Sequence, residues 1–121
     1  MDEQKITEYF LGILAQIKMF HWATTSYATH KALDDLHSTF SGHVDTFVES
    51  YIGRFKRQPL KTFKIQTEAT TDTSKIQQFL EAERETIRKM HAQFSKNSEL
   101  QNILDEMMSA FNQTIYLINL Q

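Results

Sequence analysis

The sequence predicts an all-α protein of four long helices, and two observations carry this prediction. Apolar residues recur at steps of three and four over four separate stretches, which is the spacing of one face of a helix. The 121 residues include only three glycines and one proline, so few positions favour turns. This length fits a single domain over residues 1–121 with one hydrophobic core.

The first two predicted helices are separated by a short break. The first helix runs from Glu3 to Ala23. Its apolar stripe consists of Ile6, Phe10, Ile13, Ile17 and Phe20. Residues 24–26 (Thr-Thr-Ser) favour helix caps, and the second helix starts near Tyr27 and continues to about Lys56. Its stripe consists of Leu33, Leu36, Phe40, Val44, Phe47, Tyr51 and Phe55. A break this short makes the two helices antiparallel neighbours.

The longest connection covers residues 57–73. Pro59 and five threonines argue against a straight helix in this segment. Leu60, Phe63 and Ile65 are expected to hold it against the helices. A connection of this length can join two helices that run in the same direction.

The last two helices each begin with the pattern of a capping box, in which a serine is followed by a glutamine three residues later. The third helix opens at Ser74 with Gln77, and the fourth opens at Ser98 with Gln101. Their stripes are Ile76, Leu80, Ile87, Met90 and Phe94, and then Leu100, Leu104, Met108, Phe111, Ile115 and Ile118. Four amphipathic helices with a long crossover between the second and the third indicate a four-helix bundle of the ferritin-like kind.

The composition excludes several classes of function. The formal net charge of -2 gives no global attraction to nucleic acid, and the absence of cysteine rules out disulfides, zinc fingers and thiol chemistry. No apolar run approaches the roughly 20 residues that span a bilayer, and the N-terminal MDEQK is unlike a secretory signal. We therefore expect no membrane contact and a cytoplasmic location, which is the host cytoplasm if the source is viral.

Candidate metal ligands gather on one face of the second helix. They form a first pair, His30 and Asp34, and a second pair, Asp45 and Glu49. In that order they fall at about 0°, 40°, 60° and 100° around the helix axis. Because the two residues of each pair are spaced i, i+4, their side chains are neighbours on the helix surface and can bind one ion together. Mixed imidazole and carboxylate ligands suit ferrous iron, or manganese or zinc as substitutes, better than calcium.

One chain cannot bring both pairs to the same ion. Asp34 and Asp45 are eleven residues apart, which is roughly 16 Å along a helix. Two copies packed antiparallel across a two-fold axis would place the first pair of one chain opposite the second pair of the other, and symmetry would make two such sites. His21, near the end of the first helix, is close enough in sequence to join the first pair.

The same residues carry a resemblance to a known family. Their motifs are His21-Trp22, His30-x3-Asp34 and Asp45-x3-Glu49. This order resembles the ferroxidase signature of Dps-type mini-ferritins (DNA-binding proteins from starved cells). Residues 53–64 (GRFKRQPLKTFK) are similar to the crossover of that family, and residues 97–120 resemble its last helix. The likeness covers nearly the whole chain.

The resemblance implies a function and an assembly. It implies iron ligands from two subunits, with no catalytic group beyond the ligands themselves: His21, His30 and Asp34 from one, and Asp45 and Glu49 from its two-fold mate. It implies a ferroxidase that oxidises ferrous iron, usually with hydrogen peroxide, for iron detoxification, iron storage and protection against oxidative stress. The implied homo-oligomer is at least a dimer, or a shell of twelve subunits. Many members bind DNA through a lysine-rich tail, which this chain lacks, so strong nucleic-acid binding is not expected.

Other interpretations stay open beside this one. A metal-free ferritin-like dimer that acts as an interaction or structural module is the alternative function. Trp22 is interpreted as packing at the dimer interface, and Glu83 as a buried acid bonded to a tyrosine or threonine. A basic patch is interpreted as complementing the dipole of the second helix. It consists of Arg54, Lys56, Arg57, Lys61 and Lys64.

Overall fold

The computed structural model describes residues 2–55 and 58–120, in which four α-helices account for most of the chain. The helices are α1 (Glu3–Ala23), α2 (Tyr27–Arg54), α3 (Thr73–Gln93) and α4 (Ser98–Ile118). No strand occurs among these residues, so the predicted all-α fold with four helices is confirmed. The expected end of the second helix at Lys56 lies outside the described residues, and α2 as described ends at Arg54.

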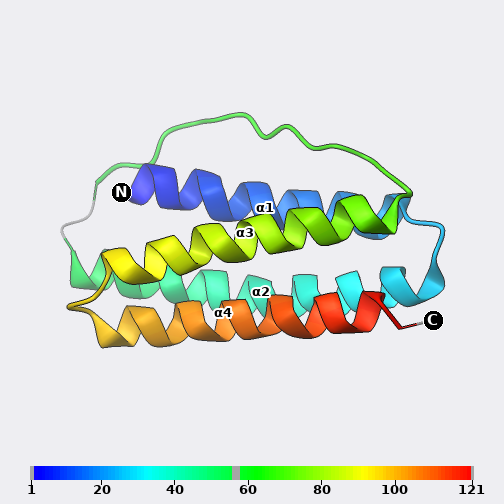
Figure 1. The fold of residues 1–121 in the computed structure, drawn as a ribbon. Helices are drawn as coiled ribbons and strands as arrows, with labels where there is room; N and C mark the ends of the chain where they lie inside the picture. Colours follow the sequence, from blue (N-terminus) through cyan, green and yellow to red (C-terminus); the bar gives the residue numbers. More distant parts are fainter. Residues whose placement is uncertain (1, 56–57, 121) are drawn as a thin grey trace.

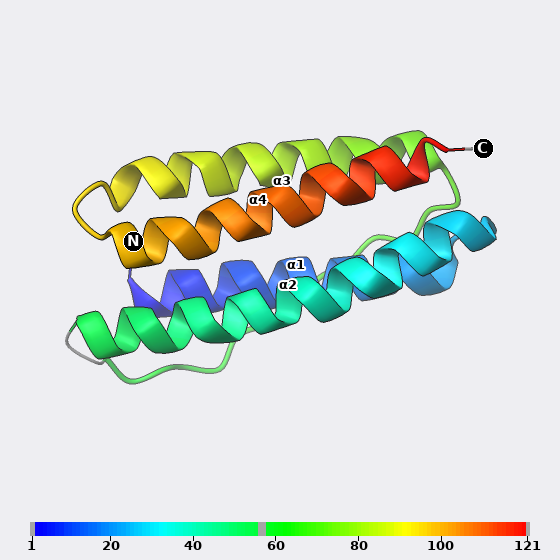
Figure 2. The ribbon, with the colours of Figure 1, turned by 90° about the horizontal axis from the view of Figure 1, so that it is seen from below.

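The four helices lie side by side along their whole lengths (Figures 1 and 2). α1 and α2 form one antiparallel pair, and α3 and α4 form another (Figure 1). α1 packs closely against α2, α2 against α4, and α4 against α3. The chain leaves α2 at one end of the molecule and enters α3 at the other end, so α2 and α3 run in the same direction (Figures 1 and 2).

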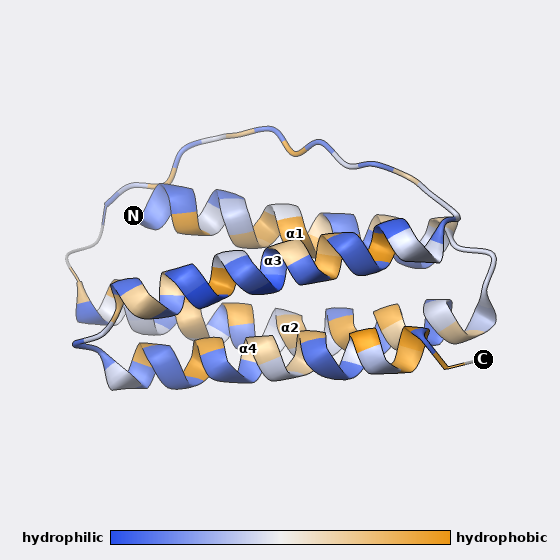
Figure 3. Ribbon diagram, viewed as in Figure 1, coloured by the Kyte–Doolittle hydropathy of each residue, from blue (hydrophilic) through white to orange (hydrophobic). Residues whose placement is uncertain are grey.

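The core is built from the predicted apolar stripes, which appear as bands along each helix in Figure 3. Phe10 of α1 contacts the rings of Phe40 and Phe47 of α2 with centroids 5.9 and 5.5 Å apart, and all three are fully buried. Two stripe positions are corrected by the structure. On α4 the buried methionine is Met107 and not Met108, and at the end of α2 Phe55 remains 38% exposed.

The helix N-termini show which side chains cap them. Ser26 caps α2 as predicted, because its hydroxyl accepts a hydrogen bond from the backbone N–H of Thr29 at 3.2 Å. The predicted capping boxes of α3 and α4 are wrong. Asp72 caps α3 by accepting from the N–H of Ser74, and α4 starts after Asn97 without a side-chain cap. The Gln101 amide, expected in a box, instead donates across the turn to the carbonyl of His91.

The connection between α2 and α3 is an extended segment, and we name its described part, residues 58–72, the strap. The strap runs the length of the molecule along α1 (Figure 1). Two glutamines of α1 hold it through their side-chain amides. Each amide donates a hydrogen bond to the backbone carbonyl of one strap residue and accepts one from the N–H of the same residue. Gln4 binds Lys61 in this way, and Gln16 binds Glu68. The expectation that apolar residues of the strap hold it is wrong for two of the three, since Leu60 and Ile65 are exposed.

Of the helices in residues 2–55 and 58–120, none is long and apolar enough to cross a bilayer.

Candidate metal centre

His21 and His30 meet at the end of the molecule where α1 passes into α2. His21 lies in the last turn of α1, and His30 lies in the first turn of α2. Only residues 24–26 separate the two helices, so the chain reverses at once and brings the two rings together. Their ring centroids are 3.9 Å apart and their planes differ by 17°, which is a stacked arrangement.

The two histidines hold each other through reciprocal hydrogen bonds. Nδ1 of His21 lies 2.8 Å from the carbonyl oxygen of His30, and Nδ1 of His30 lies 2.8 Å from the carbonyl oxygen of His21. A carbonyl oxygen only accepts, so Nδ1 carries the proton on each ring and donates it. In the neutral imidazole the other nitrogen, Nε2, then has a free lone pair, which is the form that binds a metal.

The stacking limits what the two rings can do together. A metal lies close to the plane of the imidazole that binds it, at about 2.1 Å from the nitrogen. The planes of two stacked rings whose centroids are 3.9 Å apart and whose planes differ by only 17° do not meet within such a distance. Both rings therefore cannot bind one ion in this arrangement. The structure brings the two predicted ligands together but presents one imidazole at a time to any single ion.

Asp34 provides the carboxylate beside the stacked pair. Its Oδ1 lies 3.9 Å from Nε2 of His21 and 3.9 Å from Nζ of Lys18. His21 is 7% exposed, whereas the Asp34 carboxylate is open to solvent. The ammonium of Lys18 also lies 5.8 Å from the centre of the Trp22 ring, a cation–π contact. Lys18 is thus the internal cation that an incoming metal ion would displace from Asp34.

The pKa of His37 is shifted by its surroundings in this region. Burial lowers the pKa of His37, and the nearby Lys18 charge lowers it further, while Asp34 raises it. The neutral form of His37 is therefore favoured. A neutral imidazole on the same helix, three residues beyond Asp34, adds no positive charge that would oppose a cation at Asp34.

The second predicted pair stands apart from this group. Asp45 and Glu49 are exposed on α2, beyond Asp34 by at least eleven residues, or roughly 16 Å of helix. No ion pair formed by residues 2–55 and 58–120 involves either carboxylate. Within the same residues, no cluster of three or more His, Asp or Glu side chains could hold a metal ion. The described part of one chain therefore does not bring the two predicted pairs together.

The positions of two residues beside the histidines, Lys18 and Tyr27, were not anticipated from the sequence. Lys18 precedes His21 by three residues, and this helical spacing is the signal that would have placed it on the same face. Tyr27 is 76% exposed, and its ring stacks near His30 with centroids 6.4 Å apart. Trp22, also at this end of the molecule, is 70% exposed. The two aromatic side chains project from the turn that holds the histidine pair.

The two remaining sequence predictions concern Glu83 and the basic patch. Glu83 is half-buried on α3, and the Tyr9 hydroxyl donates to its Oε1 at 3.4 Å, so the predicted bond to a tyrosine is present. In the basic patch, Nε of Arg54 lies 3.9 Å from the carboxylate of Glu99 on α4. Lys56 and Arg57 of that patch lie outside the described residues.

The fold and this group of residues define an all-helical protein whose four helices carry a histidine–carboxylate group at one end. Residues 21–118 match a family model described as a family of unknown function (DUF5856), and the chain belongs to this family. It is also similar to the uncharacterized 14.6 kDa protein in the mobD-ri intergenic region of Enterobacteria phage T4. The identity is 30% over 122 residues, which cover 97% of this chain and 90% of that protein. No solved structure matches the chain.

Proposed function

We propose that the protein is a ferritin-like, iron-binding dimer that oxidises ferrous iron at sites shared between two subunits. Of the ligands predicted from the sequence, each site takes Asp34 and one imidazole of the stacked pair His21 and His30 from one chain, and Asp45 and Glu49 from the other. The proposed benefit is removal and storage of iron and protection against peroxide. Because a relative belongs to a phage, we propose that it acts in the cytoplasm of the infected host.

The observation that carries this proposal is the pair of Nδ1 hydrogen bonds. Histidines that bind metals generally donate their other ring N–H to a carbonyl or carboxylate, which fixes the tautomer and the ring orientation. Both His21 and His30 have this second partner already in place, at 2.8 Å. The free Nε2 of His21 lies beside the Asp34 carboxylate. Imidazole and carboxylate together suit ferrous iron.

The arrangement of the helices supports the ferritin-like part of the proposal. Two antiparallel helix pairs are joined by one long connection that makes α2 and α3 parallel (Figure 1). Ferritin-like bundles share this arrangement of one long crossover. An antiparallel contact between the α2 helices of two copies would bring each Asp34 to the partner's exposed second pair.

The chain's residues would bind and orient iron, which is the substrate here. Asp34 and the second pair supply negative charge that holds the ferrous ion, and the His21 imidazole adds a neutral ligand. In the overall reaction two ferrous ions each lose one electron to one hydrogen peroxide molecule. The O–O bond breaks and two protons are taken up, so two ferric ions and two water molecules result.

Mixing two inactive variants tests whether the site is shared between chains. Asp34→Asn and Glu49→Gln should each abolish binding of ferrous ion, measured by anaerobic calorimetric titration. A mixed dimer of the two variants has one intact site, so a statistical mixture should recover about a quarter of the wild-type capacity. Asp35→Asn, which changes the adjacent exposed carboxylate, should bind like the wild type. A mixture that stays inactive would refute a shared site.

The stacked rings give a second, sharper test. His21→Ala should lower ferrous affinity by about tenfold or more, because it removes the imidazole beside Asp34. His30→Ala should lower the affinity less, since His21 keeps its hydrogen bond to the backbone carbonyl of residue 30. Equal losses in the two variants would mean that the stack opens and that both imidazoles bind the same ion.

A metal-free structural dimer is the second candidate, and one observation favours it. The reciprocal hydrogen bonds and the stacking of His21 and His30 close the turn between α1 and α2 without any metal. Sizing of the native protein together with the ferrous titration separates the two functions. A stable dimer that binds no ferrous ion would support the module and overturn the ferroxidase. A twelve-subunit particle that binds iron would add storage to oxidation.

A further inference from the structure

The seam between α1 and α3 differs from the other three sides of the molecule. α1 and α3 are neighbours on the side where the strap lies (Figure 1), but they pack less closely than the other three pairs. Side chains bridge the seam instead. Phe20 of α1 meets Phe79 of α3 edge to face at 5.4 Å, and Tyr9 of α1 reaches Glu83 of α3.

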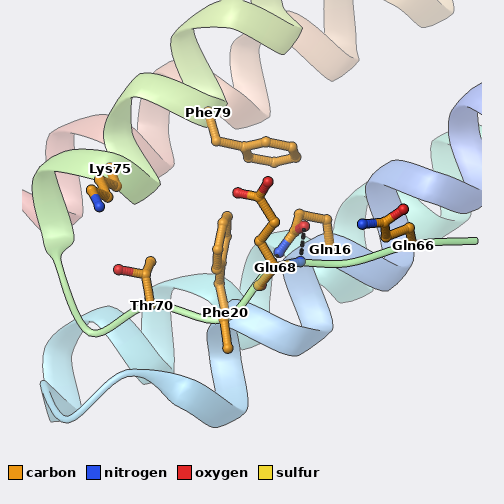
Figure 4. A pocket seen from close by; sticks show the side chains of 8 residues that line it. Gln16, Phe20, Gln66, Glu68, Thr70, Lys75 and Phe79 are labelled. Carbon is orange, nitrogen blue, oxygen red and sulfur yellow. Dashed lines mark hydrogen bonds between the residues drawn. The ribbon is translucent and has the colours of Figure 1, made fainter.

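Two cavities lie in this seam and share a wall. One has a volume of about 450 Å³ and lies between α1, α3 and the strap, where Figure 4 shows it from close by. The other has a volume of about 300 Å³ and contains Tyr9 and Glu83. Gln16, Gln66 and Phe79 line both cavities, so the two lie next to each other. The larger cavity, at about 450 Å³, is by itself in the size range of sites that bind small molecules.

Each cavity has a carboxylate that can accept further hydrogen bonds. The Glu68 side chain of the strap points toward the Phe79 ring (Figure 4), and no hydrogen bond or ion pair with residues 2–55 or 58–120 engages its carboxylate. In the other cavity Glu83 receives only the Tyr9 hydroxyl, at a long 3.4 Å. Glu8 adds a third carboxylate at the margin.

The charge of the seam is negative. Lys75 is the cation that lines the larger cavity, and it lies at the side where α3 begins (Figure 4). Hydrogen bonds from Ser74 lower the pKa of Asp72 in the cap of α3, and the Lys75 charge lowers it slightly further, so Asp72 partly balances this ammonium. Burial raises the pKa of Glu83 and the Tyr9 hydroxyl offsets only part of this effect, so the negative charge of Glu83 is incompletely compensated inside the protein. A ligand with positive charges would supply this compensation.

We propose that the seam between α1 and α3 binds a short aliphatic diamine, with one ammonium at Glu68 and the other at Glu83. Gln16 holds the Glu68 backbone and Tyr9 contacts Glu83, and these two residues are seven apart on α1. This interval is about 10 Å along the helix axis, a span that a short diamine and one hydrogen bond at each end can bridge. Phe79 lines both cavities and would contact the apolar chain of the diamine.

The binding partner is defined by its two charges and its length. A monoamine would satisfy only one carboxylate, and a divalent metal ion is too small to contact both. The strap closes the larger cavity because Gln16 fixes the Glu68 backbone on both its N–H and its C=O. Glu68 is therefore held over the seam by the same contact that attaches the strap.

Calorimetric titration of the full chain with 1,4-diaminobutane tests this inference. We expect one diamine to bind per chain, and Glu68→Gln and Glu83→Gln each to weaken binding by about tenfold or more, because each removes a charge-assisted hydrogen bond. 1-Aminobutane should bind at least about tenfold more weakly than the diamine. Glu81→Gln is the matched control, since Glu81 is an exposed carboxylate of α3 outside both cavities, and it should leave binding unchanged.

Three results would overturn the inference: no binding of the diamine, equal binding of the monoamine, or an equal loss in Glu81→Gln. The last result would show that only overall charge matters. Shifts of the Phe20 and Phe79 ring resonances on addition of diamine are expected, and their absence would place any binding elsewhere. Glutamine is isosteric with glutamate, and circular dichroism checks that each variant is folded. None of these residues is a proposed iron ligand, so the outcome is independent of iron binding.

Discussion

Replacing Gln16 by alanine should detach the strap at the middle of the molecule. Gln16 is 92% buried in α1, and its amide makes two short hydrogen bonds to the Glu68 backbone, of 2.7 and 2.8 Å. No other described contact fixes that stretch of strap backbone on both its N–H and its C=O. Alanine removes both bonds and leaves a small gap where the amide was.

The magnitude follows from these two bonds. A hydrogen bond within a protein contributes about 0.5–1.5 kcal/mol net, so two contribute about 1–3 kcal/mol. Alanine favours the helix by a few tenths of a kcal/mol over glutamine, which offsets a small part. We expect Gln16→Ala to lower the free energy of unfolding by about 2 kcal/mol. Gln4→Ala removes an equivalent pair of bonds to Lys61, but these are exposed to water, so the expected loss is below about 1 kcal/mol.

Urea unfolding followed by circular dichroism measures both variants. Limited tryptic cleavage after Lys64, an exposed lysine of the strap, gives a local readout and should be faster in Gln16→Ala than in Gln4→Ala. A loss in Gln16→Ala that is no larger than the loss in Gln4→Ala would refute the reasoning. It would mean that buried pairing at Gln16 is not what attaches the strap.

Three further variants test the core, a cap and a buried acid. Phe47→Ala, which empties a fully buried site beside Phe10, should lower the free energy of unfolding by about 3–5 kcal/mol in urea titrations. Ser26→Ala removes the cap of α2 and should cost about 1 kcal/mol in the same assay, with no change if water replaces the hydroxyl fully. Burial raises the pKa of Glu83 above 4.5, so the folded state favours its protonated form; the stability from this carboxyl is present below pH 4.5 and is lost as the pH rises through the raised pKa. Glu83→Gln should therefore be more stable than the wild type at pH 7 and similar to it at pH 4, and equal stability at both values would contradict this.

The helices could be predicted because their signals are local. The bounds of α1 follow from the periodic stripe and from the threonines and serine that end it, and the structure has the same bounds. The start of α3 could not be fixed in this way. Asp72 and Ser74 are both good caps, and only the folded backbone shows that the aspartate accepts from the N–H of residue 74. The expected box at Ser98 failed because the Gln101 amide is recruited by a carbonyl across the turn.

Contacts between distant segments were the part that sequence reasoning missed. Apolar residues of the strap were expected to bury themselves, yet Leu60 and Ile65 stay exposed while two glutamines of α1 hold the backbone. A glutamine on a helix has no spacing signal that marks it as the partner of a segment fifty residues away. The shared face of His30 and Asp34 was foreseeable, whereas the stacking of His21 on His30 depends on how tightly the turn closes.

The short turn has a consequence for the proposed iron site. Because the rings of His21 and His30 are nearly parallel at 3.9 Å, one imidazole at most faces a given ion, and the remaining protein ligands are carboxylates. Such an oxygen-rich set favours ferrous iron or manganese over zinc, which prefers nitrogen and sulfur. Any of these ions would have to displace Lys18 from Asp34, so Lys18 would oppose them equally and would not alter the order. The selectivity of the site would then originate in the length of the turn between α1 and α2, since a longer turn would allow the rings to separate and bind one ion together.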